Sequence, residues 1–221
     1  MISTLYTYPK QAHYGRVLPK NKIYEHGSLS PALKALFIQQ VERIVWQYKL
    51  APETINLPAK PGVQEIQIFD IHLKTAELNH DVLRCIDKAI PLPIIYELHY
   101  DNRIQPIATY KRPNEADNSK WVIDTYFPGD WQPSDTPRQP LPIALDLQGL
   151  YEQLLRNLIP LPQREHETLR QQVERFNLLQ SKQTEYQKQQ ARLNKEKQFN
   201  RKVELNAQLR HIKTELEQLS R

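Results

Sequence analysis

From Gln163 to its last residue, Arg221, the chain contains neither glycine nor proline. All 17 prolines and all five glycines lie within residues 1–162. Because these two residue types are the strongest helix breakers, their absence over such a length predicts a helical arm. A single continuous helix over this range would be roughly 80 Å long. A small domain cannot cover an arm of that length, so we expect a partner, a second copy of the chain or a nucleic acid to lie along it.

Cysteine and long apolar runs are also scarce. The single cysteine, Cys85, excludes an internal disulfide and a zinc site built on cysteines. With Val82, Ile86 and Ala89 it fits the apolar face of a short helix, where we expect it to pack in the core. The longest apolar stretches are too short to span a bilayer, and the N-terminus lacks a basic segment followed by an apolar run. We therefore expect a cytoplasmic protein that makes no membrane contact.

The sequence lacks the common cofactor and nucleophile motifs. Its five scattered glycines form neither a Walker loop nor Gly-x-Gly-x-x-Gly, and no serine lies in a Gly-x-Ser-x-Gly elbow. His72, His80 and His99 match no recognised spacing of metal ligands. We therefore expect no cofactor and no metal.

The excess positive charge is confined to the arm. The formal net charge is +5; residues 163–221 hold 13 Lys/Arg and 8 Asp/Glu, whereas residues 1–162 hold 17 of each. Cations concentrated on one helix could lie against nucleic-acid phosphates, and a solvated helix face or a protein-docking surface is the alternative. The arm has few aromatic residues, so stacking on single-stranded bases is not indicated. The candidates for phosphate contact are Lys188, Arg192, Lys195, Arg201 and Lys202.

Residues 1–162 predict an α+β domain with a mostly antiparallel sheet of about four strands and flanking helices. Ser30-Pro31 is a typical helix start, and helical spacing of apolar residues extends that helix over 31–49. Asn79 and Asp146 can cap two further helices, over 80–89 and from 147 onward. Runs rich in β-branched and aromatic residues predict the strands, with a tight hairpin turn at 101–103. These strands are 64–74, 94–100, 104–112 and 121–127.

The second part, 163–221, is predicted to be a long helical, coiled-coil-like arm. Five apolar residues near its end, spaced by 4, 3, 4 and 3 positions, form a short seam. A second apolar group, which includes Leu169, Val173 and Phe176, lies near its start, and the middle is polar. Either one helix contacts different surfaces at its two ends, or two helices fold as a hairpin. The lack of Gly, Pro or Asx-Gly near the middle favours one helix. The five seam residues are Leu205, Leu209, Ile212, Leu216 and Leu219.

The predicted strands carry ionisable residues that could form a nuclease site. Asp70 and Glu97 could hold a divalent metal, and Lys111 could assist the attacking water. The Glu-x-Lys spacing usual at such sites is absent after either acid. Glu97 and His99 share one face of their strand because side chains alternate with a period of two. We favour the simpler interpretation that these residues form the solvent face of a half-exposed sheet.

Four segments carry a resemblance to a known family. They are Ile86–Pro91, Tyr110–Arg112, Leu145–Leu147 with Leu150–Glu152, and Lys195–Asn206. In these segments, and in their order along nearly the whole chain, the sequence resembles a bacterial family catalogued as domain of unknown function 4391. The last segment is the most specific. Its Phe199, Asn200 and Asn206 are unusual choices for an uncontacted helix, so we expect each of them to contact something.

The resemblance implies a setting rather than a chemistry. It places the protein beside helicases and DNA methyltransferases in restriction-like, anti-phage loci, and it transfers no catalytic residue. We therefore expect a non-enzymatic accessory subunit of a DNA-processing complex that docks a larger, helicase-type partner through its arm. A metal-dependent nuclease, a direct DNA-binding module and self-association stay open as alternatives. The residues expected to bind the partner are Phe199, Asn200, Leu205, Asn206, Leu209, Ile212, Leu216 and Leu219.

Overall fold

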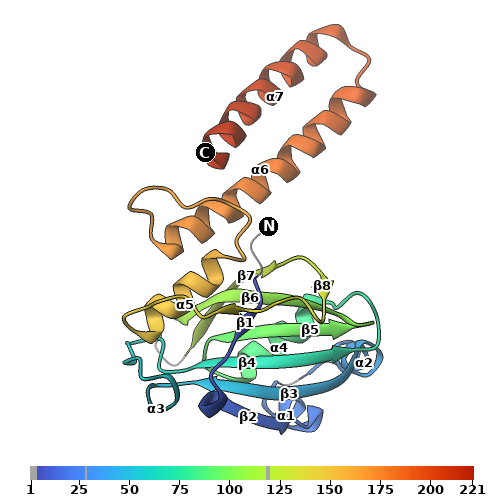
Figure 1. The fold of residues 1–221 in the computed structure, drawn as a ribbon. Coiled ribbons are helices and arrows are strands. Elements are labelled where there is room, and N and C mark those ends of the chain that lie inside the picture. The colour runs from blue at the N-terminus through green and yellow to red at the C-terminus, as the bar shows by residue number, and fades with distance from the viewer. Residues whose placement is uncertain (1–3, 28, 118–119) are drawn as a thin grey trace. The chain divides into compact units, whose positions relative to one another are not determined.

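The computed structural model of the chain describes residues 4–27, 29–117 and 120–221. The chain divides into two compact units, Met1–Leu158 and Ile159–Arg221. The first unit, called here the sheet unit, contains every strand. The second, called here the hairpin unit, contains two long helices, α6 and α7 (Figure 1).

The sheet unit is built on a mixed seven-stranded sheet with the order β2-β3-β4-β5-β6-β7, and β8 pairs with β6. Strands β4 and β5 run parallel, and the other neighbours run antiparallel. A separate parallel pair joins β1 and β9. The strands are β1 (Tyr6–Thr7), β2 (His13–Val17), β3 (Val41–Leu50), β4 (Ile66–Leu73), β5 (Ile94–Tyr100), β6 (Arg103–Pro113), β7 (Trp121–Pro128), β8 (Gln132–Pro133) and β9 (Gln139–Pro140).

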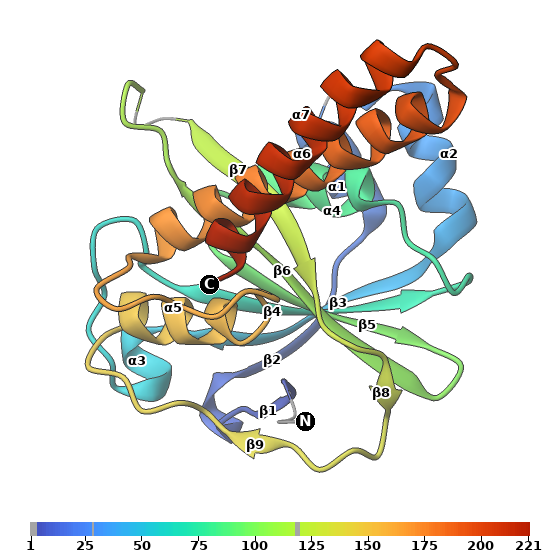
Figure 2. The ribbon, with the colours of Figure 1, turned by 90° about the horizontal axis from the view of Figure 1, so that it is seen from above.

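The sheet is therefore larger than the four strands expected, and it is mixed. The parallel pair arises because a helix, α4, lies between β4 and β5 in the chain, and such a crossover returns the next strand in the same direction. The short helices of this unit are η1 (Lys10–Ala12), α1 (Lys20–Gly27), α2 (Pro31–Gln40), α3 (Pro52–Ile55), α4 (His80–Ala89) and α5 (Leu147–Arg156). Helices α1, α2 and α4 cover one face of the sheet, and β1 and β9 lie on the other (Figures 1 and 2).

The helix predicted over 31–49 is wrong beyond Gln40. Helix α2 begins as expected, with Ser30 Oγ accepting a hydrogen bond from the Leu33 amide at 3.2 Å and Pro31 in the first turn. The chain then continues directly as β3, which pairs with both β2 and β4. The strand half is rich in β-branched and aromatic residues, which favour a pleated surface. Its apolar spacing also fits a helix, so the periodicity alone could not separate the two structures.

Several local predictions are confirmed. Helix α4 spans 80–89, and Asn79 Oδ1 accepts from the Asp81 amide at 2.8 Å. Asp146 caps α5 by accepting from the Gly149 amide at 2.8 Å. The hairpin β5–β6 turns at Asp101 and Asn102, both with positive φ, as its sequence indicated.

The main core lies between the sheet and the helices α1, α2 and α4. Its members include Phe69, Ile71, Tyr96 and Leu98 from the two parallel strands. Cys85 belongs to the same cluster and is 4% exposed, as expected for a packing residue. Because side chains alternate along a strand, Asp70, His72, Glu97 and His99 face the opposite side, towards β1 and β9.

The hairpin unit is two helices, α6 (Leu169–Lys195) and α7 (Phe199–Ser220), rather than the single helix that we favoured. The chain reverses at Glu196–Gln198, and α7 packs back along α6 (Figure 1). This turn needs neither Gly nor Pro, because Glu196 Oε1 accepts from the amides of Lys197 and Gln198 at 2.8 and 2.9 Å. Helical structure through most of Glu167–Leu219 agrees with the sequence.

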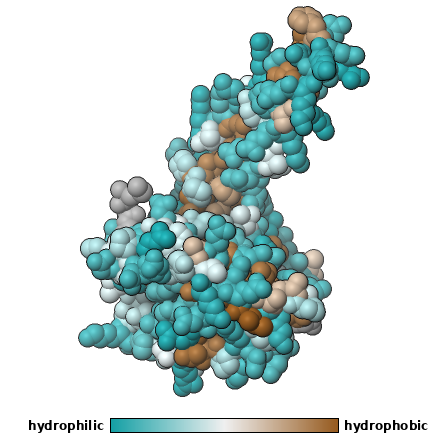
Figure 3. All heavy atoms as spheres, turned by 90° about the vertical axis from the view of Figure 1, so that its right-hand side faces the viewer, coloured by the Kyte–Doolittle hydropathy of each residue, from teal (hydrophilic) through white to brown (hydrophobic). Residues whose placement is uncertain are grey.

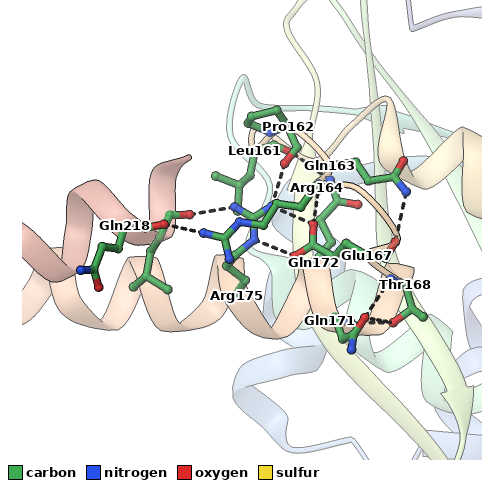
Figure 4. A network of polar contacts seen from close by, with 11 residues as sticks. Leu161, Pro162, Gln163, Arg164, Glu167, Thr168, Gln171, Gln172, Arg175 and Gln218 are labelled. Atoms are coloured by element: carbon green, nitrogen blue, oxygen red, sulfur yellow. Dashed lines mark hydrogen bonds and ion pairs between the residues drawn. The ribbon is translucent and has the colours of Figure 1, made fainter.

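A polar network ties the two helices together at the end away from the turn (Figure 4). The buried Arg175 donates to both oxygens of Glu167 at 2.7 and 2.8 Å, and to the carbonyl oxygens of Pro162 and Leu219 at 2.7 Å each. Arg164 donates to the Gln218 carbonyl oxygen. Arg175 and Arg164 thus satisfy carbonyl groups at the C-terminal end of α7, where cations are electrostatically favoured.

Among the residues that the structure describes, no helix combines the length and apolar character needed to cross a bilayer.

Candidate functional site

Within the described residues, side chains able to bind a ligand cluster at two places. The first cluster lies on the sheet face that carries β1 and β9. Asp70 on β4 pairs in register with Glu97 on β5, and His99 follows two residues after Glu97. One possible ligand atom from each of these residues lies within 4.8 Å of the others. We call Asp70, Glu97 and His99 the sheet-face cluster. The adjacent parallel strands place the two carboxylates side by side.

Glu97 is held by an arginine from outside the sheet. Arg138, just before β9, donates to Glu97 Oε1 and Oε2 at 2.8 and 2.6 Å, and also to the Tyr6 carbonyl oxygen at 2.9 Å. Hydrogen bonding to Glu97 raises the pKa of Arg138 above its already high value, so the guanidinium is always charged. Burial raises the pKa of Tyr8, and the charge of Glu97 adds to this effect. The bidentate ion pair fixes the orientation of the Glu97 carboxylate.

His72 lies beside the sheet-face cluster but has a different partner. Its ring stacks on that of His99, with centroids 4.8 Å apart and planes 18° from parallel. Its Nε2 lies 3.1 Å from Nη2 of Arg43, so the neutral ring accepts this hydrogen bond. Burial lowers the pKa of His72, and the nearby His99 and Arg43 lower it further. His72 is therefore neutral at pH 7 and engaged by Arg43.

Lys111 is not part of the sheet-face cluster, so the three residues of the nuclease hypothesis do not converge. Glu97 pairs with Pro106, and Lys111 follows Pro106 by an odd number of residues, so it faces the other side of the sheet. There its fully buried ammonium group contacts Asp87 Oδ1 at 3.3 Å and donates to the Ile90 carbonyl oxygen. Asp87 also accepts from the Tyr126 hydroxyl at 2.5 Å. Lys111 thus belongs to a buried ion pair beneath α4.

The expectation of a half-exposed solvent face is also wrong for these residues. Asp70, Glu97 and Lys111 are at most 9% exposed. The segments around β1 and β9 cover the face that carries Asp70 and Glu97, and α4 covers the face that carries Lys111. Nothing in the strands themselves could predict this cover, because it comes from segments distant in sequence.

The predicted seam is partly used within the chain. Leu209 and Ile212 are buried, at 6% and 4% exposure, and α7 packs along α6. Leu205, Leu216 and Leu219 are partly buried. The interior of the hairpin therefore accounts for much of the seam that we expected to bind a separate partner.

The second gathering of side chains is the end of the hairpin at the Glu196–Gln198 turn, which we call the turn end. All five cations predicted to contact phosphates lie there and are exposed, and Lys197 joins them. Among the described residues, none of these six cations forms an ion pair, whereas Lys182 pairs with Glu185 and Glu215. Arg192, Lys195 and Arg201 line a hollow of about 380 Å³ together with Glu196 and Glu204. The six cations are Lys188, Arg192, Lys195, Lys197, Arg201 and Lys202.

Apolar side chains are exposed at the same end. Phe199 is 76% exposed and Val203 is 53% exposed, one helical turn apart on α7. Asn200 and Asn206 are exposed as well, and Asn206 donates to the Lys202 carbonyl oxygen at 2.9 Å. Figure 3 shows the hairpin surface as mainly hydrophilic, with separate apolar side chains. The sequence pattern indicated Phe199, Asn200 and Asn206 but not Val203, which its spacing from Phe199 could have revealed.

These features define a class of protein: a mixed α/β sheet domain joined to a helical hairpin with a basic turn end. The chain belongs to the family described as domain of unknown function (DUF4391), whose sequence profile matches residues 7–216. The comparisons with curated proteins and with solved structures gave no match.

Proposed function

We propose that the protein is a non-enzymatic accessory subunit of a nucleic-acid-processing complex, and that the turn end of its hairpin is the contact element. The observation that carries this proposal is the group of six exposed cations without ion pairs beside the exposed Phe199 and Val203. A helicase-type partner in an anti-phage complex, expected from the family resemblance, is the assembly that we propose.

The charge distribution supports a polyanionic partner at the turn end. Neighbouring lysines and arginines that form no ion pairs repel one another. A bound anion relieves this repulsion, so the cluster of cations is stabilised mainly when an anion is bound. Nucleic-acid phosphates release condensed counterions when such cations bind, and this release drives association. Glu196 lies in the turn itself; hydrogen bonds from two backbone amides lower its pKa, and the nearby charges of Arg201 and Lys202 lower it further.

Because the interior of the hairpin is already packed, we place the proposed docking surface on the outside of the hairpin. Leu209 and Ile212 are already buried and cannot bind a partner without opening the helices. Phe199 and Val203 are large, exposed and close together, which is typical of residues that become buried in a complex. Within the proposal, the two apolar side chains contact the protein partner and the cations contact the nucleic acid that it processes.

Direct nucleic-acid contact is tested by salt titration of binding to two unrelated duplexes. The variant K195Q/R201Q/K202Q removes three cations at the turn end. If all three contact phosphates, the log–log salt slope should fall by up to about 2.7, since each contact contributes about 0.9. Binding should weaken equally on both duplexes, because phosphate contacts carry no sequence information.

A matched control removes the same charge from residues 210–221, the half of the α7 segment farther from the turn. R210Q/K213Q/R221Q changes three exposed cations of the same unit and should leave the slope nearly unchanged. If both triple variants lower the slope equally, binding follows net charge and the turn end has no special role. If the wild-type protein does not bind at low salt, direct nucleic-acid contact is wrong.

Partner docking is tested by co-purification from the native host after nuclease treatment. Phe199→Asp with Val203→Asp should remove the bound protein, whereas Ile38→Asp, at a side chain 55% exposed in the sheet unit, should not. Both changes are at exposed positions, so folding should survive. A partner that is retained by the double variant would rule out the turn end as its docking surface.

A further inference from the structure

The sheet-face cluster contains a buried nitrogen atom without a hydrogen bond. His99 Nε2 is buried and makes no hydrogen bond, and the nearest carboxylate oxygen, Asp70 Oδ1, is 3.5 Å away. Although this distance is short enough for an electrostatic contact, it is longer than the usual 2.7–3.2 Å of an N–H···O hydrogen bond. A buried polar atom left unsatisfied costs about 1–3 kcal/mol, so its presence needs an explanation.

The 3.5 Å distance between His99 Nε2 and Asp70 Oδ1 is close to that between two ligands of one metal ion. Zinc binds histidine nitrogen and carboxylate oxygen at about 2.0–2.2 Å, and two such ligands at a tetrahedral angle lie about 3.4 Å apart. The nitrogen of His99 and an oxygen each of Asp70 and Glu97 all lie within 4.8 Å of one another. Glu97, which pairs in register with Asp70, supplies the third possible ligand atom within this range.

The surroundings are compatible with a bound cation. Two carboxylates face one guanidinium, that of Arg138, so a negative charge remains for a cation to neutralise. Arg138 donates one hydrogen bond to each oxygen of Glu97, and an ionised carboxylate has about four lone-pair sites, so acceptor capacity remains. Groups that hydrogen-bond to ligands in this way commonly fix the orientation of metal sites.

We propose that Asp70, Glu97 and His99 bind one divalent transition-metal ion of the zinc type. Mixed imidazole and carboxylate ligands favour this class over magnesium or calcium, which prefer oxygen ligands alone. The site joins β4, β5 and, through Arg138, the segment that carries β9. This inference is independent of the hairpin function, because all its residues lie in the sheet unit.

The neighbouring histidine provides a matched control. His72 stacks on His99 in the same sheet face, but its Nε2 already accepts from Arg43. If His99 is the ligand, His99→Gln should weaken metal binding and His72→Gln should not. Both changes replace an imidazole with an amide in adjacent positions of the same face, so their effects on folding should be similar.

The test is calorimetric titration of the metal-free full-length protein with Zn²⁺, with Co²⁺ absorption as a second readout. The wild-type protein should bind one ion per chain at this site, with visible Co²⁺ bands of low-coordinate geometry. Asp70→Asn and His99→Gln should weaken binding at least about tenfold, as loss of ligand-sphere groups does. At equal Zn²⁺ concentration the rise in melting temperature should be larger for the wild-type protein and His72→Gln than for Asp70→Asn, since the stabilisation grows with the affinity of the folded state for the ion.

Three results would overturn the proposal. One is the absence of stoichiometric Zn²⁺ and Co²⁺ binding by the wild-type protein, a measurement that needs no variant to fold. Another is equal binding by the wild-type protein, Asp70→Asn and His99→Gln, which would place the ion at another histidine. If His72→Gln and His99→Gln weaken metal binding equally, the assignment of His99 as the ligand is wrong.

Discussion

At the level of single residues, Lys111 shows how strongly position in the sheet determines chemical role. A lysine near two acids in a strand-rich segment suggests a nuclease, but the side chain points away from both. It is instead fully buried with Asp87, and burial lowers the pKa of Lys111 and raises the pKa of Asp87. Lys111 contacts the Asp87 carboxylate and the Ile90 carbonyl oxygen, and through these contacts it stabilises the fold.

Lys111→Met should therefore destabilise the sheet unit by about 3–5 kcal/mol, because it leaves the Asp87 carboxylate buried without its cation. Urea unfolding measures this change. Lys60→Met is the control, since Lys60 is 49% exposed and 3.8 Å from Asp146, and it should cost less than about 1 kcal/mol. A similarly small cost for Lys111→Met would mean that the buried pair contributes little.

Among the helices and strands, two segments adopted structures that their own patterns left open. Residues 41–50 could continue α2, but they form β3 between β2 and β4, where both edges of the strand find hydrogen-bond partners. The arm could be one helix, but it folds at Glu196–Gln198, where local side-chain acceptors replace the missing helical bonds. Folding back lets apolar positions at the two ends of the arm be buried within the same unit.

Leu209→Asp should unfold or open the hairpin unit, because it places a charge at a position only 6% exposed. Ala207→Asp, at an exposed position on the same helix, should have little effect. Hydrogen exchange of the α7 amides distinguishes the two variants, with faster exchange expected only for Leu209→Asp. Equal protection in both would show that the α6–α7 interface does not stabilise α7.

The network at the other end of the hairpin predicts a pH dependence. Hydrogen bonds from Arg175 hold the pKa of Glu167 below its ordinary value of 4.5. A carboxylate with a lowered pKa in the folded state contributes stability that is full above its unfolded pKa and is lost as the pH falls through its folded pKa. Protection of the α6–α7 amides should therefore decline below about pH 4.5.

Glu167→Gln should lower that protection at neutral pH and remove much of its acid dependence. Glu165→Gln, at a side chain 91% exposed, should leave both unchanged. An acid response in Glu167→Gln equal to that of the wild-type protein would assign the pH dependence to other carboxylates.

In the molecule as a whole, the chain is organised as two compact units. The sheet unit buries residues from both faces of its sheet, and the hairpin unit buries Leu209 and Ile212 together with several α6 positions. The proposed metal ligands therefore lie in one unit, and the basic turn end lies in the other. The family profile nevertheless spans both, from residue 7 to residue 216.

Residues 1–158 produced alone should retain the cooperative thermal transition of the sheet unit, because its core cluster lies within that range. Calorimetry of this fragment beside the full-length protein measures the transition. If the core depends only on its own unit, the shift in melting temperature should be a few degrees, as for a change of about 1 kcal/mol. Loss of the cooperative transition would show that the two units fold as one.

Several local features of this protein follow from its sequence alone. Helix breakers are absent after Pro162, so most of that region is helical; Asn79 and Asp146 cap helices, because short polar side chains satisfy free amides. The cations at the turn end were likewise indicated by the charge distribution, and Phe199 by the segment that resembles the family. Features that depend on residues distant in the chain came instead from the tertiary structure. Strand register placed Asp70 beside Glu97 and turned Lys111 to the other face, and chain reversal closed the seam against α6. These contacts join residues that are distant in the chain, so the sequence pattern of a single segment cannot predict them.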